Sequence, residues 1–496
     1  MRRALAALVL MGGLGSLWWL SRPSASTRAA WVADLERLER HTATAYANLG
    51  DRLASRHLSP RELDRVARAA LARASSRSEA RHALERFVAA FDDAHFRAAA
   101  PVGAGQRLLR RLLGRERRDA RPIPLALPGD DACARFGAHD RRDGPIAWST
   151  LDGFTPLDGD AATHPFPAGL LRRADAGPLA ILRIGLFDAF AFPELCAAEW
   201  DRFRTDPTTP EAACDEDCRE RFATRLERAL LDRLDAELAE LAELTTSGAN
   251  TLLVDITGNG GGSGIVGAMT RAMTTRPIPP RATGFIRHPH STRRLTAMAE
   301  DLRTDLSRSD LSTRQRALLG EALLRLDTAI AEAASPCDLP DLWSSPTGTS
   351  LPCATIGRLE PLAPAATAAD FAGLESRWLA GSEDGRRPGA WRGELVVLVD
   401  RRTASAAEDF AASLQDAGAA RVAGERTMGV GCGYTDGGVT LELPATGLTV
   451  RAPDCVRFRA DGRNEAEGVE PDLPIARNPG DDAQAAARRI VAAISS

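Results

Sequence analysis

Two short, almost continuously apolar segments constrain the fold of this chain more than any other feature. Residues 252–256 read Leu-Leu-Val-Asp-Ile, and residues 395–399 read Leu-Val-Val-Leu-Val. Such a run is typical of a strand that is buried on both faces of a parallel sheet. Further patterns surround these two, with strands at residues 179–184 and 421–423, helices at about 216–245 and 406–417, and a hairpin-like alternation at 439–453. This alternation of strands and helices predicts an α/β core.

The 496 residues allow about two to four domains, and composition divides the chain further. Residues 31–98 have helical spacing and helix-start signals. Residues 99–177 are a mixed linking region, rich in Arg, Pro and Gly. We expect the remaining parts to be a core over residues 178–476, a helical insertion within it at about 280–390, and a C-terminal helix at 477–496.

The first 26 residues have the features of a targeting segment. Arg2 and Arg3 precede an apolar run at residues 4–20, and small residues follow at 24–26. This is the order of regions in a secretory signal peptide. The run is also at the lower length limit of a membrane anchor. We expect export to the periplasm or the exterior, with the segment either cleaved or retained as an inner-membrane anchor, and no other membrane association.

The cysteine content agrees with export, because an even number of cysteines favours disulfides in an oxidising compartment. One sequence does not determine the connectivity. We expect the pairs Cys432–Cys455, Cys214–Cys218, Cys337–Cys353 and, by elimination, Cys133–Cys196. A zinc site is the alternative, but the Cys-x-x-x-Cys segment at 214–218 has neither a second matching pair nor a nearby histidine. We therefore expect no metal.

The charged residues exclude several classes of function. The chain has 63 basic and 67 acidic residues, a net charge of −4, which argues against a nucleic-acid partner. The sequence contains no lysine, so every basic residue is arginine. Schiff-base chemistry, phosphate-binding loops that close with lysine, and serine–lysine dyads are therefore excluded.

Three segments can carry chemistry. Ser405 lies between the strand at 395–399 and the next helix, where the helix N-terminus can stabilise a developing oxyanion. The alternative is a purely structural role as the N-cap residue of that helix. The glycine-rich turn at 258–262 can present backbone amides to an anion, or can be a tight connection only. His95, at the end of a helix, can be a general base or a structural histidine.

Four motifs resemble one family when they are taken in order. They are Thr-Ala-Ser-Ala-Ala-Glu at 403–408 (compare T-A-S-A-x-E), Asp-Ile-Thr-Gly-Asn-Gly-Gly-Gly at 255–262 (D-x-R-x-N-x-G-G), Gly-Glu-Arg-Thr-Met-Gly at 424–429 (G-E-x-T-x-G) and Glu-Ala-Glu-Gly-Val-Glu-Pro-Asp at 465–472 (E-x-x-G-V-x-P-D). Thr257 stands where the second motif usually has arginine. Together the motifs resemble the C-terminal processing, or tail-specific, serine peptidases, a family that includes the tricorn protease core.

The base separates two branches of this family. One branch uses a lysine after the G-E-x-T-x-G segment, but Val430 occupies that position here. The other branch, like tricorn, uses a histidine in a D-G-H-like segment, which Asp93-Ala94-His95 resembles. Residues 99–175 lack the A-G-L-x-x-G-D pattern of a substrate-capturing PDZ-like domain. The resemblance is therefore to the histidine-using branch without a PDZ domain.

The resemblance implies a ClpP/crotonase-like α/β peptidase core preceded by a helical N-terminal domain. It also implies an exported serine peptidase that needs no cofactor and hydrolyses peptide bonds of polypeptide substrates. Ser405 would be the nucleophile and His95 the general base, and Glu465 would orient or support the imidazole.

The oxyanion hole implied by the resemblance consists of the backbone amides of Ala406 and of Gly260 or Gly261. Two other functions stay open. Retinoid-binding members of the family indicate a catalytically silent binding or scaffold protein for a small hydrophobic ligand or a peptide, because the fold does not determine the function. The second alternative is a hydrolase of another ester or amide, since the catalytic groups do not specify the acyl group.

Overall fold

The computed structural model describes residues 23–495 apart from residues 100–121, 158, 161, 174–176, 207–212, 245–250, 263, 340, 345–350, 352, 365, 372, 381–388 and 390. The expected signal peptide or anchor at residues 1–26 lies almost wholly outside the described residues. Among the helices of the described part, none combines the length and the apolar character that a membrane span requires.

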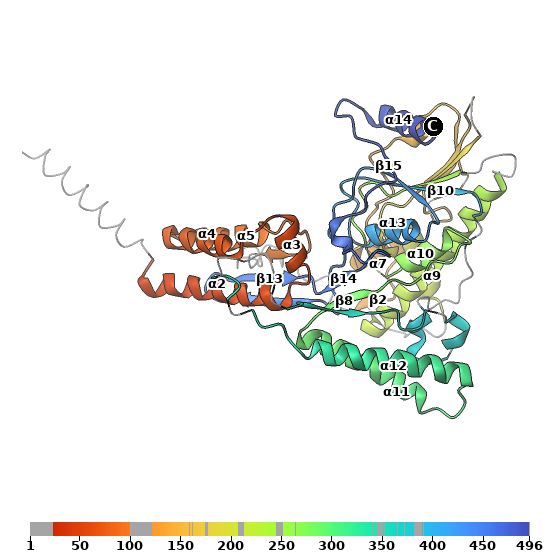
Figure 1. The fold of residues 1–496 in the computed structure, drawn as a ribbon. Coiled ribbons are helices and arrows are strands. Elements are labelled where there is room, and N and C mark those ends of the chain that lie inside the picture. Colours follow the sequence, from red (N-terminus) through yellow and green to blue (C-terminus); the bar gives the residue numbers. More distant parts are fainter. Residues whose placement is uncertain are drawn as a thin grey trace, which may run out of the picture.

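A seven-stranded sheet forms the centre of the molecule (Figure 1). Its strands, in spatial order, are β15 (Leu473–Pro474), β11 (Arg421–Gly424), β10 (Glu394–Val399), β7 (Thr251–Asp255), β5 (Leu179–Arg183), β4 (Ala168–Leu171) and β3 (Phe154–Pro156). The first five are parallel, and β4 and β3 are antiparallel to their neighbours. The predicted α/β core is confirmed. β3 and β4 come from the segment that the sequence assigned to the linking region at 99–177.

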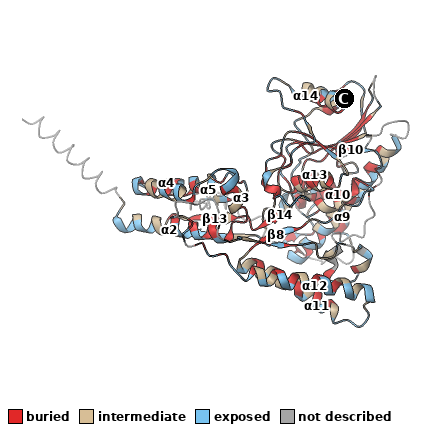
Figure 2. Ribbon diagram, viewed as in Figure 1, coloured by how far each residue is buried: buried red, intermediate tan, exposed pale blue. Residues whose placement is uncertain are grey.

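The central strands are apolar in their middle positions because helices cover both faces of the sheet (Figure 2). On one face, Leu252 and Val254 of β7 belong to a large core, and on the other face Leu253 belongs to a second core. The large core includes residues of α7 (Gly129–Phe136), α8 (Pro193–Phe203), α9 (Glu216–Leu244), α10 (Val266–Ala272) and α13 (Ala406–Asp416). The second core includes α14 (Ala483–Ser495). A small ladder joins β2 (Ile123–Pro124) to β6 (Ala213–Cys214).

Four N-terminal helices pack against a hairpin from the far end of the chain. The helices are α2 (Ala25–Ala45), α3 (Leu49–Ser55), α4 (Pro60–Arg73) and α5 (Arg77–Ala89), and the hairpin is β12 (Val439–Leu443) with β13 (Leu448–Ala452). Strand β1 (Arg97–Ala99) then adds to β13 in antiparallel register, with Arg97 opposite Arg451. This pairing fixes the position of His95, two residues before β1.

The insertion forms a helical hairpin below the core (Figure 1). Its helices α11 (Pro289–Leu306) and α12 (Thr313–Ala333) share a core of their own. Strands β8 (Thr283–Ile286) and β9 (Ile356–Leu359) flank the hairpin in sequence and pair with each other, and β14 (Cys455–Arg457) pairs with β8. The insertion is thereby attached to β14, the strand that follows the β12–β13 hairpin in the sequence.

All eight cysteines form disulfides, with the expected connectivity. The pairs are Cys133–Cys196, Cys214–Cys218, Cys337–Cys353 and Cys432–Cys455. Disulfides of this number indicate an exported protein or an oxidising compartment.

Replacing Leu253 in the central strand tests how the sheet is buried. Leu253→Ala removes a fully buried side chain between the sheet and α14, and we expect the free energy of unfolding to fall by about 2–5 kcal/mol. Leu324→Ala is the matched control, because Leu324 is 68% exposed on α12 and should change stability by less than about 0.5 kcal/mol. Urea unfolding monitored by circular dichroism measures both. Equal effects of the two substitutions would contradict this packing.

Candidate active site

Ser405 has an unusual backbone conformation for a residue that starts a helix. It precedes α13 with φ +58° and ψ −120°, a region that costs a non-glycine residue on the order of 1–3 kcal/mol and is concentrated at functional sites. Four other serines cap helices in the ordinary way. Each has an extended backbone, and its hydroxyl accepts a hydrogen bond from the amide three residues later. They are Ser24, Ser59, Ser76 and Ser312. The conformation of Ser405 therefore calls for more than a capping role.

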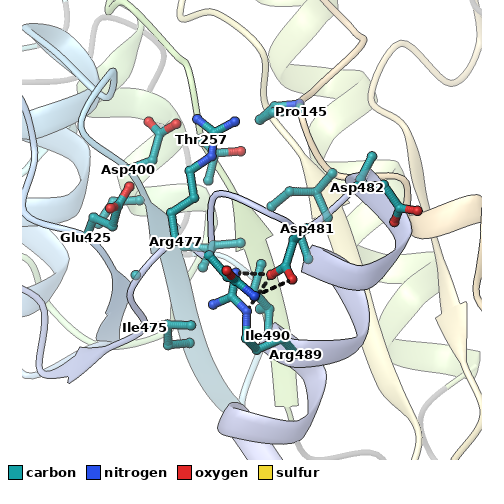
Figure 3. A pocket seen from close by; sticks show the side chains of 17 residues that line it. Pro145, Thr257, Asp400, Glu425, Ile475, Arg477, Asp481, Asp482, Arg489 and Ile490 are labelled. Atoms are coloured by element: carbon teal, nitrogen blue, oxygen red, sulfur yellow. Dashed lines mark hydrogen bonds and ion pairs between the residues drawn. The ribbon is translucent and has the colours of Figure 1, made fainter.

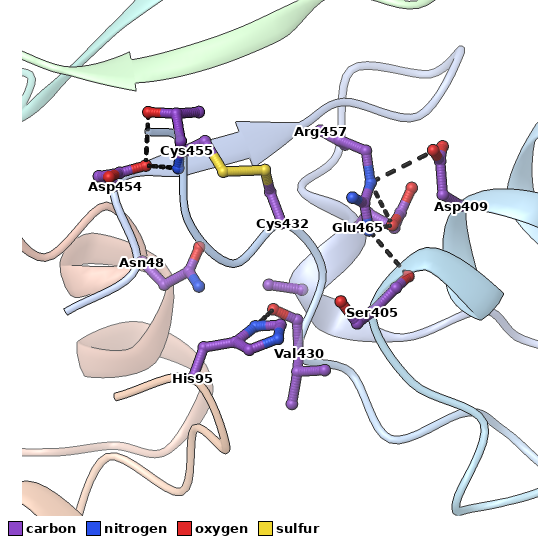
Figure 4. Close-up of a disulfide and its surroundings, with 12 residues drawn as sticks. Asn48, His95, Ser405, Asp409, Val430, Cys432, Asp454, Cys455, Arg457 and Glu465 are labelled. Carbon is purple, nitrogen blue, oxygen red and sulfur yellow. Dashed lines mark hydrogen bonds and ion pairs between the residues drawn. A yellow bond between two sulfur atoms is a disulfide. The ribbon is translucent and has the colours of Figure 1, made fainter. Parts of the chain in front are cut away.

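Two charged side chains bind the Ser405 backbone. The Ser405 amide donates to Glu408 Oε2 at 2.9 Å. The Ser405 carbonyl accepts from the guanidinium of Arg457 at 2.8 Å (Figure 4). Arg457 also forms a two-bond ion pair with Glu465 Oε1, at 2.8 and 2.6 Å. The second oxygen of Glu465 accepts from Arg281 at 2.8 Å. Glu465 thus reaches Ser405 through Arg457, and in the described structure it makes no hydrogen bond to His95.

The imidazole of His95 is oriented by the backbone of Val430. His95 Nδ1 lies 3.3 Å from the Val430 carbonyl oxygen. A carbonyl only accepts hydrogen bonds, so Nδ1 carries the proton and Nε2 is the ring nitrogen that can accept one. Tyr434 donates its hydroxyl to the His95 carbonyl and packs edge-on against the ring, with centroids 5.6 Å apart. Val430 is the residue at the position of the lysine in the other branch of the family.

Asp93 anchors His95 in the N-terminal lobe. Its Oδ1 accepts the His95 amide at 2.9 Å, and its Oδ2 accepts from Tyr46 at 2.9 Å and Asn48 at 3.0 Å. Asn48 also accepts from the Asn464 side chain, next to Glu465, at 3.0 Å. The segment that carries His95 is therefore bonded to the segment that carries Glu465.

The structure brings the side chains of Ser405 and His95 to the same place from distant parts of the chain. They lie on either side of Val430 in Figure 4, and no hydrogen bond between them is present in the described structure. Burial lowers the pKa of His95 below the ordinary value of 6.5, although the charge of Asp93 raises it in part. At neutral pH the imidazole is therefore neutral, the state in which it can accept a proton.

The glycine-rich turn lies directly against Ser405. A Cβ added to Gly261, where φ is +106°, would come within 2.7 Å of Ser405 Cβ, so this position requires glycine. The Gly261 amide donates to Asn259 Oδ1 at 2.8 Å and is not free. Among the hydrogen bonds between described residues, none uses the amides of Gly260 or Ala406. Of the two glycines considered for the oxyanion hole, Gly260 is thus the one with an available amide.

Thr257 compensates locally for the missing arginine of its motif. Its hydroxyl and amide donate to Asp255 Oδ1 at 2.7 and 2.9 Å. A guanidinium is supplied instead by Arg183 of the neighbouring strand, which bonds the same oxygen at 3.1 Å. The buried carboxylate at the end of β7 is thus neutralised without the family's arginine.

A separate cavity of about 150 Å³ lies under α14, on the other side of the strand ends (Figure 3). It is lined by Thr257, Asp400, Glu425, Arg477 and Arg489 among others, and Ser405 is not part of the lining. Asp400 Oδ1 accepts the amide of Gly258 at 2.8 Å, so this cavity backs the glycine-rich turn. No cluster of three or more metal-binding side chains occurs within the described residues.

The comparisons with known proteins agree with the fold. The model of peptidase family S41 matches residues 231–475. Mature CPAF in its crystal structure is 15% identical, with 95% of this chain and 97% of that chain covered and a TM-score of 0.54. Mature CPAF complexed with lactacystin is 14% identical, with 95% and 98% covered and a TM-score of 0.56. Fold and family model together define a serine-type peptidase, a hydrolase. Residues 231–475 of the chain belong to peptidase family S41.

Two residues at this site were not singled out by the sequence. Glu408 is the last residue of the T-A-S-A-x-E motif, so its place in the motif was a signal that could have marked it as a site residue. Arg457 belongs to no motif and is one of 63 arginines, so its contact with Ser405 had no signal in the sequence.

The Cys432–Cys455 disulfide joins the segment that orients His95 to the strand that holds Ser405, since Val430 and Arg457 are each two residues away. We expect the double substitution of Cys432 and Cys455 by serine to lower peptidase activity about tenfold or more, beside a stability loss of about 2–4 kcal/mol. Hydrolysis of denatured casein, at a temperature where circular dichroism shows a folded protein, measures this.

The double serine variant of Cys214 and Cys218 is the control, because this disulfide spans only four residues and contacts none of the site side chains described above. It should keep near-normal activity. Equal losses in the two variants would contradict a specific role of the first disulfide.

Proposed function

We propose that this chain is an exported peptidase that hydrolyses polypeptides with Ser405 as nucleophile, His95 as general base and Glu465 as the supporting carboxylate. The observation that carries the proposal is the backbone of Ser405, which is held at positive φ at the start of α13 with His95 nearby. Structures store strain of this kind where function requires it.

The reaction follows the general pattern of serine acyl transfer. His95 Nε2 takes the Ser405 hydroxyl proton as Oγ attacks the scissile carbonyl carbon. The amides of Ala406 and Gly260 bind the oxyanion that forms, aided by the positive end of the α13 dipole. His95 then gives the proton to the leaving amine, which departs and leaves an acyl-serine. A water, deprotonated by His95, releases the acid product and restores Ser405.

Glu465 supports this reaction without touching the imidazole. Its carboxylate is buried and paired with Arg457 and Arg281. Arg457 in turn holds the Ser405 carbonyl, so the charge of Glu465 fixes the arginine that fixes the nucleophile. The carbonyl of Val430 takes the part of imidazole orientation that the sequence had assigned to Glu465.

Export completes the proposal. The targeting pattern at residues 1–26 and the four disulfides both fit a protein that leaves the cytoplasm for the periplasm or the exterior. The segment would either be cleaved or hold the peptidase at the inner membrane.

Substituting Ser405 is the direct test. We expect Ser405→Ala to lower the rate of casein hydrolysis by about a thousandfold or more, and His95→Ala by about a hundredfold or more, with the folded state retained. New amino termini released per minute measure the rate, and Ser413→Ala on the same helix is the control. Full activity of Ser405→Ala would refute the assignment. A wild-type protein that cleaves nothing and reacts with no serine probe would favour the binding-protein alternative.

The acid limb of the activity profile should lie below pH 6.5. His95 must be neutral to accept a proton, and burial lowers its pKa, so activity is retained through pH 6.5 and is lost only as the pH falls through the lowered value. Arg97 contributes to the lowering, so Arg97→Gln should move the limb towards higher pH. The rate of Ser405 labelling by a fluorophosphonate, measured against pH, reports the limb. A midpoint above 6.5 in the wild type would contradict this environment for His95.

A further inference from the structure

Glu408 accepts an exceptional number of hydrogen bonds for one side chain. Oε1 accepts from the Thr427 hydroxyl and the Gly429 amide, both at 2.6 Å. Oε2 accepts from the amides of Ser405, Val430 and Gly431, at 2.9, 3.1 and 3.0 Å. The side chain has no solvent exposure.

Only the ionised carboxylate satisfies this set of partners. All five are donors, and a protonated carboxyl or an amide would direct a donor of its own at one of them. Burial raises the pKa of Glu408, but the hydrogen bonds from Thr427 and from the loop amides act in the opposite direction. Burying a charged carboxylate costs more free energy than burying a neutral side chain, and the five hydrogen bonds to Glu408 offset this cost.

The five donors come from the two halves of the proposed catalytic pair. One is the amide of Ser405, at its strained position before α13. The others belong to residues 427–431, the loop whose Val430 carbonyl orients His95. Val430 therefore faces Glu408 with its amide and His95 with its carbonyl. Through this one residue, the Glu408 carboxylate is connected to the imidazole.

We propose that Glu408 is the positioning residue that sets the alignment of Ser405 with His95, by binding the nucleophile's amide and the loop that orients the base with one carboxylate. The proposal rests on Ser405 and His95 acting as nucleophile and base. Glu408 touches neither substrate nor the reacting atoms, and its effect is on the rate of the chemical step.

Glu408→Gln tests the proposal, because it keeps the shape of the side chain and replaces one acceptor by a donor. Asp305→Asn is the matched control. Asp305 is also a buried carboxylate, and it accepts from the Glu375 amide and the Ser376 amide and hydroxyl within the helical insertion. Both substitutions should lower the unfolding midpoint, and only the first should affect Ser405.

The readout is labelling by a fluorophosphonate, in which the Ser405 oxygen displaces fluoride from phosphorus while the base takes the serine proton. We expect Glu408→Gln to label Ser405 at least a hundredfold more slowly than the wild type and Asp305→Asn to label within threefold of it. With casein, Glu408→Gln should lower kcat and leave KM within about twofold. If Glu408→Gln does not fold, Glu408→Asp keeps the charge but withdraws the acceptor by one methylene, and should label at least tenfold more slowly.

The outcomes separate this inference from the proposed function. Labelling of wild-type Ser405 together with slow labelling of the folded Glu408 variant supports both. Wild-type labelling with an unchanged rate in the folded variant overturns the positioning role and leaves the proposed function in place. An equal loss of rate in the Asp305 control also overturns it, because the loss then follows stability. A wild-type protein that is not labelled at Ser405 overturns both.

Discussion

The strained backbone of Ser405 is the constraint on which the rest of the site depends. A serine at φ +58° does not hold that conformation unaided, so its amide and carbonyl are each bound by a charged group, Glu408 and Arg457. Each of these is then fixed by further contacts, Glu408 by residues 427–431 and Arg457 by Glu465. Strand β10 and α13 place Ser405 and Glu408, β14 carries Arg457, and the disulfide at 432–455 connects β14 to the segment that includes Val430.

The second constraint is the joining of the chain's two ends. The N-terminal helices share one hydrophobic core with the β12–β13 hairpin, to which β1 adds as a third strand. His95 stands between α5 and β1, so burial of apolar surface in this lobe places it beside Val430, 335 positions along the chain. The proposed base thus belongs to one part of the fold and the proposed nucleophile to another, so the contacts that stabilise the fold also set the distance between them.

Sequence patterns predicted what depends on local periodicity, and the resemblance to a family predicted what depends on motifs. The apolar runs at 252–256 and 395–399 became β7 and β10, and the cysteine pairs were correct. Strands β3 and β4 were not foreseen, because such short strands are stabilised only by pairing, β4 with β5 and β3 with β4. Nor could the sequence tell which glycine amide is free, since that depends on the direction of the Asn259 side chain. Glu465 pairs with Arg457 and not with His95, and this contact depends on tertiary structure that no local pattern of the sequence indicates.

The most direct test of this account is to map where a peptidyl chloromethyl ketone reacts. Such a reagent adds to the active serine and alkylates the histidine beside it, so it reports which histidine stands next to the nucleophile. The chain has eight histidines. We expect mass spectrometry of the digested protein to find one alkylated histidine, His95, and no alkylation in Ser405→Ala. Alkylation of another histidine, or of His95 at the same rate without the Ser405 hydroxyl, would contradict it.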